Sequence, residues 1–216
     1  MASKQLNLRN VINVIGWPIP FISRMRNIIL FLCFFSSTQL YAQTTVDDMD
    51  TQILMKLEHS RTNTQTHILR TISDANNYVN AAIPISMFVA GIADHNKDLR
   101  QNALYVASSA ASTALLNFAV KQIFKRHRPF EVHATLTPVY KPGGYSFPSG
   151  HTSLSFATAT ALSRVYPKWY VIVPVFLWAG SVGYSRMYLG VHNPSDVLTG
   201  AALGIGTASA LSFIRP

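Results

Sequence analysis

The chain has 216 residues and a formal net charge of +9, with 49% hydrophobic and only 12% charged residues. Its length suits one domain or one compact membrane unit rather than two domains. The mean hydropathy of +0.19 and the low charged fraction lie toward the membrane-protein side of the soluble range. The basic excess favours phosphate-bearing or anionic partners. Nucleic acid is not expected as a partner, because the basic residues are sparse and no nucleic-acid motif is present.

The acidic residues are unevenly spread. Seven of the nine lie between Asp47 and Asp98, whereas residues 99–216 hold only Glu131 and Asp196 beside ten Lys or Arg. A metal site built from clustered carboxylates is therefore not expected in this half, and we predict neither a metal nor another cofactor. Chemistry there has to use His, Lys, Arg and backbone N–H groups.

The N-terminal part predicts a targeting segment. From Met25 a basic start, an apolar run and a cleavage position after Ala42 form the three regions of a signal peptide, preceded by an upstream extension. The alternative for residues 1–42 is an uncleaved anchor. The single cysteine, Cys33, lies in the apolar run and has no internal disulfide partner. Export through this segment predicts a protein of the bacterial cell envelope.

The rest of the chain predicts an all-α fold. Residues 43–79 are polar, with apolar positions spaced as in one or two amphipathic helices on a core or membrane surface: Ile53, Leu54, Leu57, Ile68, Leu69 and Ile72. Five apolar stretches follow, at 80–93, 101–120, 152–166, 169–184 and 195–214. Residues 80–216 are therefore expected to form a membrane-embedded bundle of about five core helices. Most stretches are shorter than the roughly 20 residues of a membrane span, so the depth of the bundle in the bilayer stays open.

An up-and-down arrangement of these helices brings several polar segments to one end of the bundle. The helix over 101–120 ends there, that over 152–166 begins, that over 169–184 ends, and that over 195–214 begins. Residues 43–79 share the same end by this count. Since a signal peptide would deliver them outside the cytoplasmic membrane, the polar end is expected to face the periplasm.

The first polar patch contains Lys121 and Arg128. They are seven residues apart, two turns of a helix, and can point at one anion if the helix persists that far. Pro129 biases Arg128 toward an extended backbone, which turns its guanidinium over the mouth of the bundle. The alternative is a basic helix end that faces solvent or lipid headgroups and is stabilised by the helix dipole.

The second patch, Ser149-Gly150-His151, opens an apolar helix. Free N–H groups at a helix start bind phosphate oxygens, and a glycine there lets the backbone approach closely. Alternatively, Ser149 is a helix cap and His151 a surface histidine.

The third patch contains Arg186, His192 and Asp196. Pro194 suits the first helical position and Asn193 the cap, which places Asp196 in the first turn. There Asp196 can cap the helix reciprocally, and it can also accept a hydrogen bond from one ring nitrogen of His192. The other ring nitrogen would then be free to attack phosphorus.

Together the patches read Lys-x6-Arg-Pro, Pro-Ser-Gly-His and Ser-Arg-x5-His-x3-Asp, in this order. This arrangement resembles the type 2 phosphatidic acid phosphatase superfamily, which includes bacterial non-specific acid phosphatases and vanadium haloperoxidases. The resemblance covers about 80–214, and the stretch YLGVHNPSDVLTG is more similar to the membrane lipid-phosphatase branch.

The resemblance implies that Lys121, Arg128 and Arg186 hold the phosphoryl oxygens, with Ser149 and Gly150 completing the cradle. It makes His192 the nucleophile of a phosphohistidine intermediate, Asp196 its orienting group and His151 the acid for the leaving oxygen. The function implied is metal-independent hydrolysis of a lipid-linked phosphate or diphosphate. The alternatives are a soluble periplasmic acid phosphatase, a vanadate-dependent haloperoxidase and a lipid-phosphate binder without turnover. Four nearby residues are expected only at the rim: Lys125, Arg126, His127 and Tyr188.

Overall fold

The computed structural model describes residues 46–216, so the predicted upstream extension, the signal peptide and Cys33 lie outside the described residues. Residues Met49–Pro216 form one compact unit, which contains the bundle and the candidate site.

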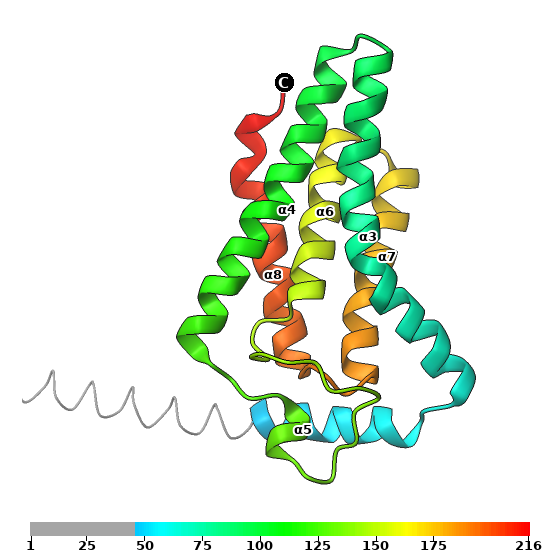
Figure 1. Ribbon diagram of the computed structural model, residues 1–216, viewed down its shortest axis with the longest axis vertical. Helices are drawn as coiled ribbons and strands as arrows, with labels where there is room; N and C mark the ends of the chain where they lie inside the picture. Colours follow the sequence, from blue (N-terminus) through cyan, green and yellow to red (C-terminus); the bar gives the residue numbers. More distant parts are fainter. Residues whose placement is uncertain (1–45) are drawn as a thin grey trace, which may run out of the picture. The chain divides into compact units, whose positions relative to one another are not determined.

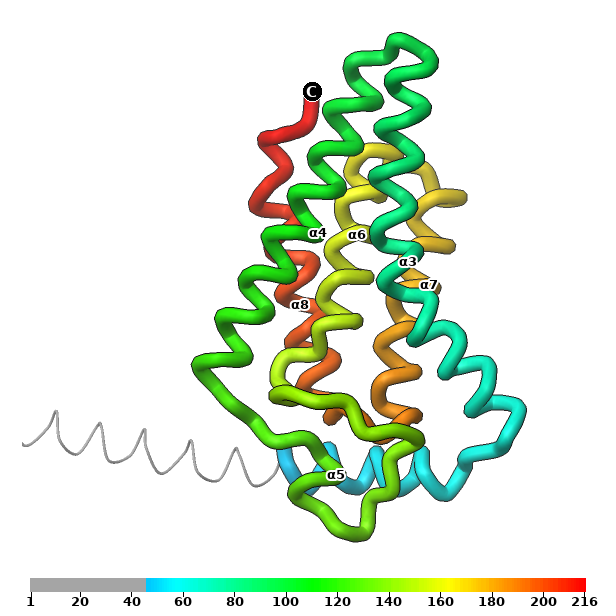
Figure 2. Tube along the Cα trace, in the orientation of Figure 1, coloured from blue at the N-terminus to red at the C-terminus, as the bar shows by residue number. Residues whose placement is uncertain are grey.

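The regular elements of the described residues are helices, which confirms the predicted all-α fold (Figure 1). A helix ends at residue 59, and the following elements are α3 (Asn63–Ala93), α4 (Lys97–Phe124), α5 (Pro129–Val132), α6 (Gly150–Val165), α7 (Trp169–Tyr188), α8 (Pro194–Ala210) and a short 3₁₀ helix (Leu211–Ile214). The five long helices α3, α4, α6, α7 and α8 form one bundle (Figure 2). Because α6 packs against the other four, it is the central helix.

The first apolar stretch does not form a helix of its own. It is the second half of α3, which begins in the amphipathic segment and runs across residues 79 and 80 without a break. The break falls earlier, where the side chain of Thr62 accepts a hydrogen bond from the backbone N–H of Gln65 and caps α3. No glycine or proline separates the two halves of α3, so the change of composition marks a change of surroundings rather than the end of a helix.

Glycines bring α6 and α8 into close contact. A Cβ placed on Gly204 would lie 2.2 Å from the carbonyl oxygen of Ser153, and one on Gly200 would lie 2.7 Å from that of Ser149. Small residues of this kind let two helix backbones approach each other directly. The contact fixes the beginning of α6 against the beginning of α8, and these two helix ends carry the second and third polar patches.

The outer surface of the bundle is apolar. Two segments of the described chain, Lys97–Val132 and Pro194–Ile214, are long and apolar enough to cross a membrane. Large apolar side chains point outward from several helices, among them Leu115, Phe118, Leu177 and Leu198. A surface of this kind is unusual for a protein in water and suits a lipid environment.

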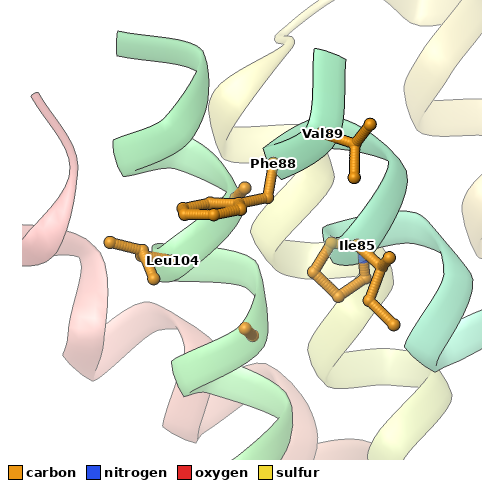
Figure 3. Close-up of a pocket in the computed structure, with 7 residues that line it drawn as sticks. Ile85, Phe88, Val89 and Leu104 are labelled. Atoms are coloured by element: carbon orange, nitrogen blue, oxygen red, sulfur yellow. The ribbon is translucent and has the colours of Figure 1, made fainter. Parts of the chain in front are cut away.

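An apolar hollow of about 260 Å³ lies between α3 and α4, and Figure 3 shows its lining side chains. The lining residues are Pro84, Ile85, Phe88, Val89, Ala103, Leu104 and Ala107. Because none of them is charged, this hollow is not a site for an anion.

Candidate active site

The three predicted patches meet at one end of the bundle. A nitrogen of Arg128 lies 3.4 Å from Nε2 of His192, which joins the first patch to the third. The backbone N–H of Ser149 donates to the carbonyl oxygen of Asp196 at 3.0 Å, which joins the second to the third. The up-and-down arrangement predicted from the sequence is therefore confirmed.

Arg128 is held rigidly. It has an extended backbone, with φ −77° and ψ 154°, as the following proline predicts. Its guanidinium donates to the carbonyl oxygens of Gly144 at 3.0 Å, Gly143 at 3.0 Å and Val191 at 2.8 Å. The side chain is buried, so a fixed positive charge lies beside the ring of His192.

Lys121 and Arg186 are also fixed by the protein. Nζ of Lys121 donates to the carbonyl oxygens of Tyr145 at 2.6 Å and Ser146 at 3.2 Å. One terminal nitrogen of Arg186 donates to the hydroxyl oxygens of Tyr140 and Ser73. Its Nε is buried and has no hydrogen-bond partner among the described residues. A buried donor of this kind calls for an acceptor, and an anion would supply one.

The contact between His192 and Asp196 differs from the predicted direct hydrogen bond. Nδ1 of His192 lies 3.6 Å from Oδ2 of Asp196, which is longer than a hydrogen bond. The hydroxyl group of Ser146 donates to the same Oδ2 and lies 3.4 Å from Nδ1. Asp196 also accepts from the backbone N–H of Asn193 at 2.8 Å, so the predicted reciprocal cap is confirmed. Ser146 therefore takes part in orienting the ring, a role that the sequence did not indicate.

Arg126 and Tyr188 are not rim residues, contrary to the sequence-based expectation. One terminal nitrogen of Arg126 donates to Oδ1 of Asp196 at 2.8 Å, and the other lies 3.1 Å from Oδ2 of Asp50. Tyr188 is only 1% exposed, and its hydroxyl group accepts from the backbone N–H at the start of α3. Asp50 lies 146 positions before Asp196 in the chain, so no local spacing could have revealed this network.

Two of the predicted rim residues, Lys125 and His127, are exposed as expected. Lys125 has φ 46° and ends α4, which lets the chain turn toward Arg128.

The second patch forms the beginning of α6. Ser149 occupies the cap position, but its hydroxyl group bonds to that of Thr152 at 2.8 Å rather than to a backbone N–H. The preceding turn is held by Asn117, whose amide group donates to Ser153 at 3.0 Å and to the carbonyl oxygen of Pro148 at 3.4 Å. The first N–H groups of α6 thus remain at the same end as the three cations, where they can bind an anion.

The surroundings of both imidazoles favour their neutral forms, because they lower the pKa of each ring. Burial lowers the pKa of His192 to about 3, and the positive charge of Arg186 adds to the effect while Asp196 opposes it. Burial and the charges of Arg186, Arg128 and Lys121 lower the pKa of His151 to about 4. A neutral His192 that carries its proton on Nδ1 has its lone pair on Nε2, the nitrogen that faces Arg128.

Within residues 46–216, no three or more His, Cys, Asp or Glu side chains lie together so that they could hold a metal ion. The positive charge at the site comes from Lys121, Arg128 and Arg186, which the structure brings together with both imidazoles.

The fold and this cluster define a helical bundle with three buried or half-buried cations and two imidazoles at one end. Residues 102–215 match the model of the PAP2 superfamily, and the chain belongs to that family. The fold is similar to that of a transmembrane PAP2-type phosphatidylglycerolphosphate phosphatase from Bacillus subtilis, with a TM-score of 0.68 and 25% identity, over 86% of this chain and 94% of that one.

Two curated relatives are enzymes of lipid phosphates by name. An undecaprenyl-diphosphatase from Sulfolobus acidocaldarius is 36% identical over 119 residues, which cover 55% of each chain. A lipid A 4'-phosphatase from Bacteroides thetaiotaomicron is 40% identical over 62 residues, which cover 29% of this chain and 28% of that protein. This chain therefore spans about half the length of the first relative and less of the second.

Proposed function

We propose that the protein is a metal-independent phosphatase that hydrolyses a lipid-linked phosphate or diphosphate through a phosphohistidine at Nε2 of His192. One observation carries the proposal: Nε2 faces Arg128 at 3.4 Å, while Nδ1 faces Ser146 and Asp196. In the proposed tautomer, Nε2 of His192 presents its lone pair toward the three cations, and the N–H at Nδ1 points toward Ser146 and Asp196.

The first step transfers the phosphoryl group. Lys121, Arg128 and Arg186 bind its oxygens and neutralise their charge, which is the main requirement of phosphoryl transfer. The lone pair on Nε2 of His192 forms a bond to phosphorus as the bond to the leaving oxygen breaks. His151 gives its proton to that oxygen, and Asp196 stabilises the positive charge that develops on the phosphorylated ring.

The second step releases phosphate. A water molecule gives a proton to His151 and attacks phosphorus, and the phosphorus–nitrogen bond breaks. Inorganic phosphate leaves, His192 is again neutral and His151 is again protonated. The bound phosphoryl dianion offsets the three cations, so the pKa of His151 rises in the complex and the ring can hold the proton it must donate.

The outward-facing apolar side chains and the names of the relatives favour a lipid over a soluble substrate. A second hollow of about 230 Å³ lies between α3, α6 and α7, and Asn80, Ser155 and Trp178 are among its lining residues. Ser155 donates to the carbonyl oxygen of His151 at 2.9 Å, so this hollow begins one helical turn along α6 from His151. An acyl or prenyl chain can occupy such a space while the headgroup reaches His192. We place the protein in the membrane of a bacterial cell envelope, with the site facing the periplasm.

The test is phosphate release by purified protein in detergent with EDTA present. The panel contains undecaprenyl diphosphate, lipid A, phosphatidic acid, phosphatidylglycerol phosphate and, as a soluble substrate, p-nitrophenyl phosphate. We expect turnover of at least one lipid with EDTA present and none by the His192→Ala variant. Equal turnover by wild type and His192→Ala would refute the covalent mechanism, and loss of wild-type activity with EDTA would refute metal independence. A preference for p-nitrophenyl phosphate would favour a non-specific acid phosphatase instead.

A further inference from the structure

The helix that ends at residue 59 lies outside the part of the chain that matches the family model, residues 102–215. It nevertheless contributes a buried carboxylate to the surroundings of the site. Asp50 is only 4% exposed. Oδ1 accepts from the backbone N–H of Ser195 at 2.9 Å, and Oδ2 accepts from the hydroxyl group of the same serine. Asp50 is therefore bound to the first turn of α8, one residue before Asp196.

Arg126 connects Asp50 with Asp196. Its Nη2 lies 3.1 Å from Oδ2 of Asp50, and its Nη1 donates to Oδ1 of Asp196 at 2.8 Å and to the hydroxyl oxygen of Ser195 at 2.7 Å. A guanidinium that bridges two carboxylates is fixed in its plane as well as in its position. Arg126 thus occupies Oδ1 of Asp196 and leaves Oδ2 for Ser146 and His192.

Asp50, Arg126 and Asp196 form a chain of alternating charge, and Asp50 stabilises the arginine that pairs with Asp196. Asp196 is fully buried, and a buried carboxylate without a compensating partner is costly. Arg126 supplies that partner, but its own side chain is 27% exposed, so solvent can compete for it. Asp50, whose side chain is 6% exposed, binds the guanidinium on the side away from Asp196.

We propose that Asp50 is a positioning residue for His192, which acts through Arg126 and Asp196. This inference rests on the proposed function, since it assigns Asp50 to the orientation of the proposed nucleophile. Asp50 holds the guanidinium and the first turn of α8, the guanidinium holds Oδ1 of Asp196, and Oδ2 then meets the Nδ1 side of the ring. Asp50 and Arg126 contact Ser195, Asp196 and each other, and the proposed mechanism assigns neither of them to the phosphoryl group. Their loss is therefore expected to slow the chemical step and to leave binding of the anion unchanged.

The alternative is that Asp50 only anchors its helix to the bundle. Measurements of kcat, KM and the melting temperature distinguish the positioning role from the anchoring role. A positioning residue lowers kcat and leaves KM unchanged, whereas a loosened anchor lowers the melting temperature and leaves kcat of the folded protein unchanged. The isosteric Asp50→Asn removes the charge and keeps the shape. The matched control is Asp48→Asn, the same change at an exposed position two residues earlier in the same helix.

The experiment measures kcat and KM on the best lipid of the panel, and the Ki of inorganic phosphate. For Asp50→Asn we expect kcat to fall about 10-fold, and for Arg126→Gln about 100-fold, by analogy with the loss of a group that orients a metal-binding histidine. KM and the phosphate Ki should stay within about 2-fold of wild type, and Asp48→Asn should match wild type. The double variant should be no slower than Arg126→Gln alone, because both changes break one chain of contacts.

An unchanged kcat for Asp50→Asn would overturn the proposal, and so would fully additive losses in the double variant. If Asp50→Asn fails to fold, Asp50→Glu keeps the charge and moves it by one methylene, and wild-type kcat in that variant would also overturn the proposal.

A measurement that does not require catalytic turnover tests the role of Asp50 independently of the proposed function. The ¹⁵N resonances of the His192 ring, assigned with His192→Ala, should shift in Asp50→Asn and not in Asp48→Asn. If wild type hydrolyses none of the lipids, the proposed function fails, and this comparison alone decides whether Asp50 orients the ring. Identical His192 resonances in wild type and Asp50→Asn would then refute the positioning role.

Discussion

The contact between α6 and α8 predicts that one methyl group will damage both the stability and the chemistry of the protein. Gly204 faces α6 so closely that a Cβ would lie 2.2 Å from the carbonyl oxygen of Ser153 and 2.8 Å from the backbone nitrogen of Ala157. Both neighbours are backbone atoms of a helix and cannot rotate away. An ordinary contact of a Cβ begins near 3.4 Å, so Gly204→Ala requires the two helices to separate by about 1 Å.

The size of the effect follows from two opposing terms. Replacing glycine by alanine inside a helix stabilises it by about 1 kcal/mol. Overpacking a tight contact costs up to about 3 kcal/mol. The net loss of about 2 kcal/mol corresponds to a melting temperature lower by about 4–8 °C for a chain of this size. The same separation moves Ser149 and His151 away from His192, and a misplacement of about 1 Å can slow a reaction roughly 100-fold.

The assay compares Gly204→Ala with Gly206→Ala, two residues further along the same helix. A Cβ on Gly206 meets nothing within 4 Å, and the position is exposed. We expect Gly206→Ala to keep wild-type kcat/KM and to melt at the same or a slightly higher temperature. Thermal unfolding in detergent and lipid-phosphate turnover give both quantities. If the two variants behave alike, the close approach of α6 and α8 does not set the geometry of the site.

Four further predictions concern the site and the core. Since the pKa of His192 is about 3, the proposed nucleophile is neutral above pH 5 and should cause no acidic fall in kcat/KM there. The pKa of His151 is about 4, and the proposed mechanism requires it to rise when a phosphoryl dianion binds. The basic limb of kcat should therefore lie at higher pH than that of kcat/KM, and coinciding limbs would contradict this. Ser146→Ala removes the hydroxyl group between Asp196 and His192 and should lower kcat about 10-fold with little change in KM, whereas an unchanged kcat would show that Asp196 orients the ring alone. Tyr105→Phe leaves the carbonyl oxygen of Ala208 without its donor and should lower the free energy of unfolding by about 1–3 kcal/mol at unchanged kcat, as measured by denaturation in detergent.

Much of this site is predictable from the sequence, because the residues of each patch lie within about ten positions of one another in the chain. The position of Asp196 in the first turn after His192 follows from helix geometry and from Pro194, and the extended backbone of Arg128 follows from Pro129. Helix spacing does not set the distance from Lys121 to Arg128, because α4 ends at Phe124. Helix length and alternating direction then bring the patches to one end. Asp196 as a helix cap is predictable for the same reason, since the cap and the first turn are only three residues apart.

The helix boundaries were less predictable where composition and conformation disagree. A polar segment followed by an apolar stretch looks like two elements, yet α3 runs through both. Hydrophobic patterning reports what surrounds a helix, and a single helix can leave a polar end and enter an apolar bundle.

The sequence by itself determined which polar patches gather at one end of the bundle, because their positions at the helix ends follow from local spacing and from the up-and-down order of the helices. Only the tertiary structure decided what holds them. Ser146 enters between Asp196 and His192, and Asp50 reaches Arg126 from a helix 76 residues away in the chain. Such contacts depend on the relative positions of whole helices. Those positions are set by packing surfaces such as the glycines of α8, and the sequence spacing of the contacting residues does not determine them.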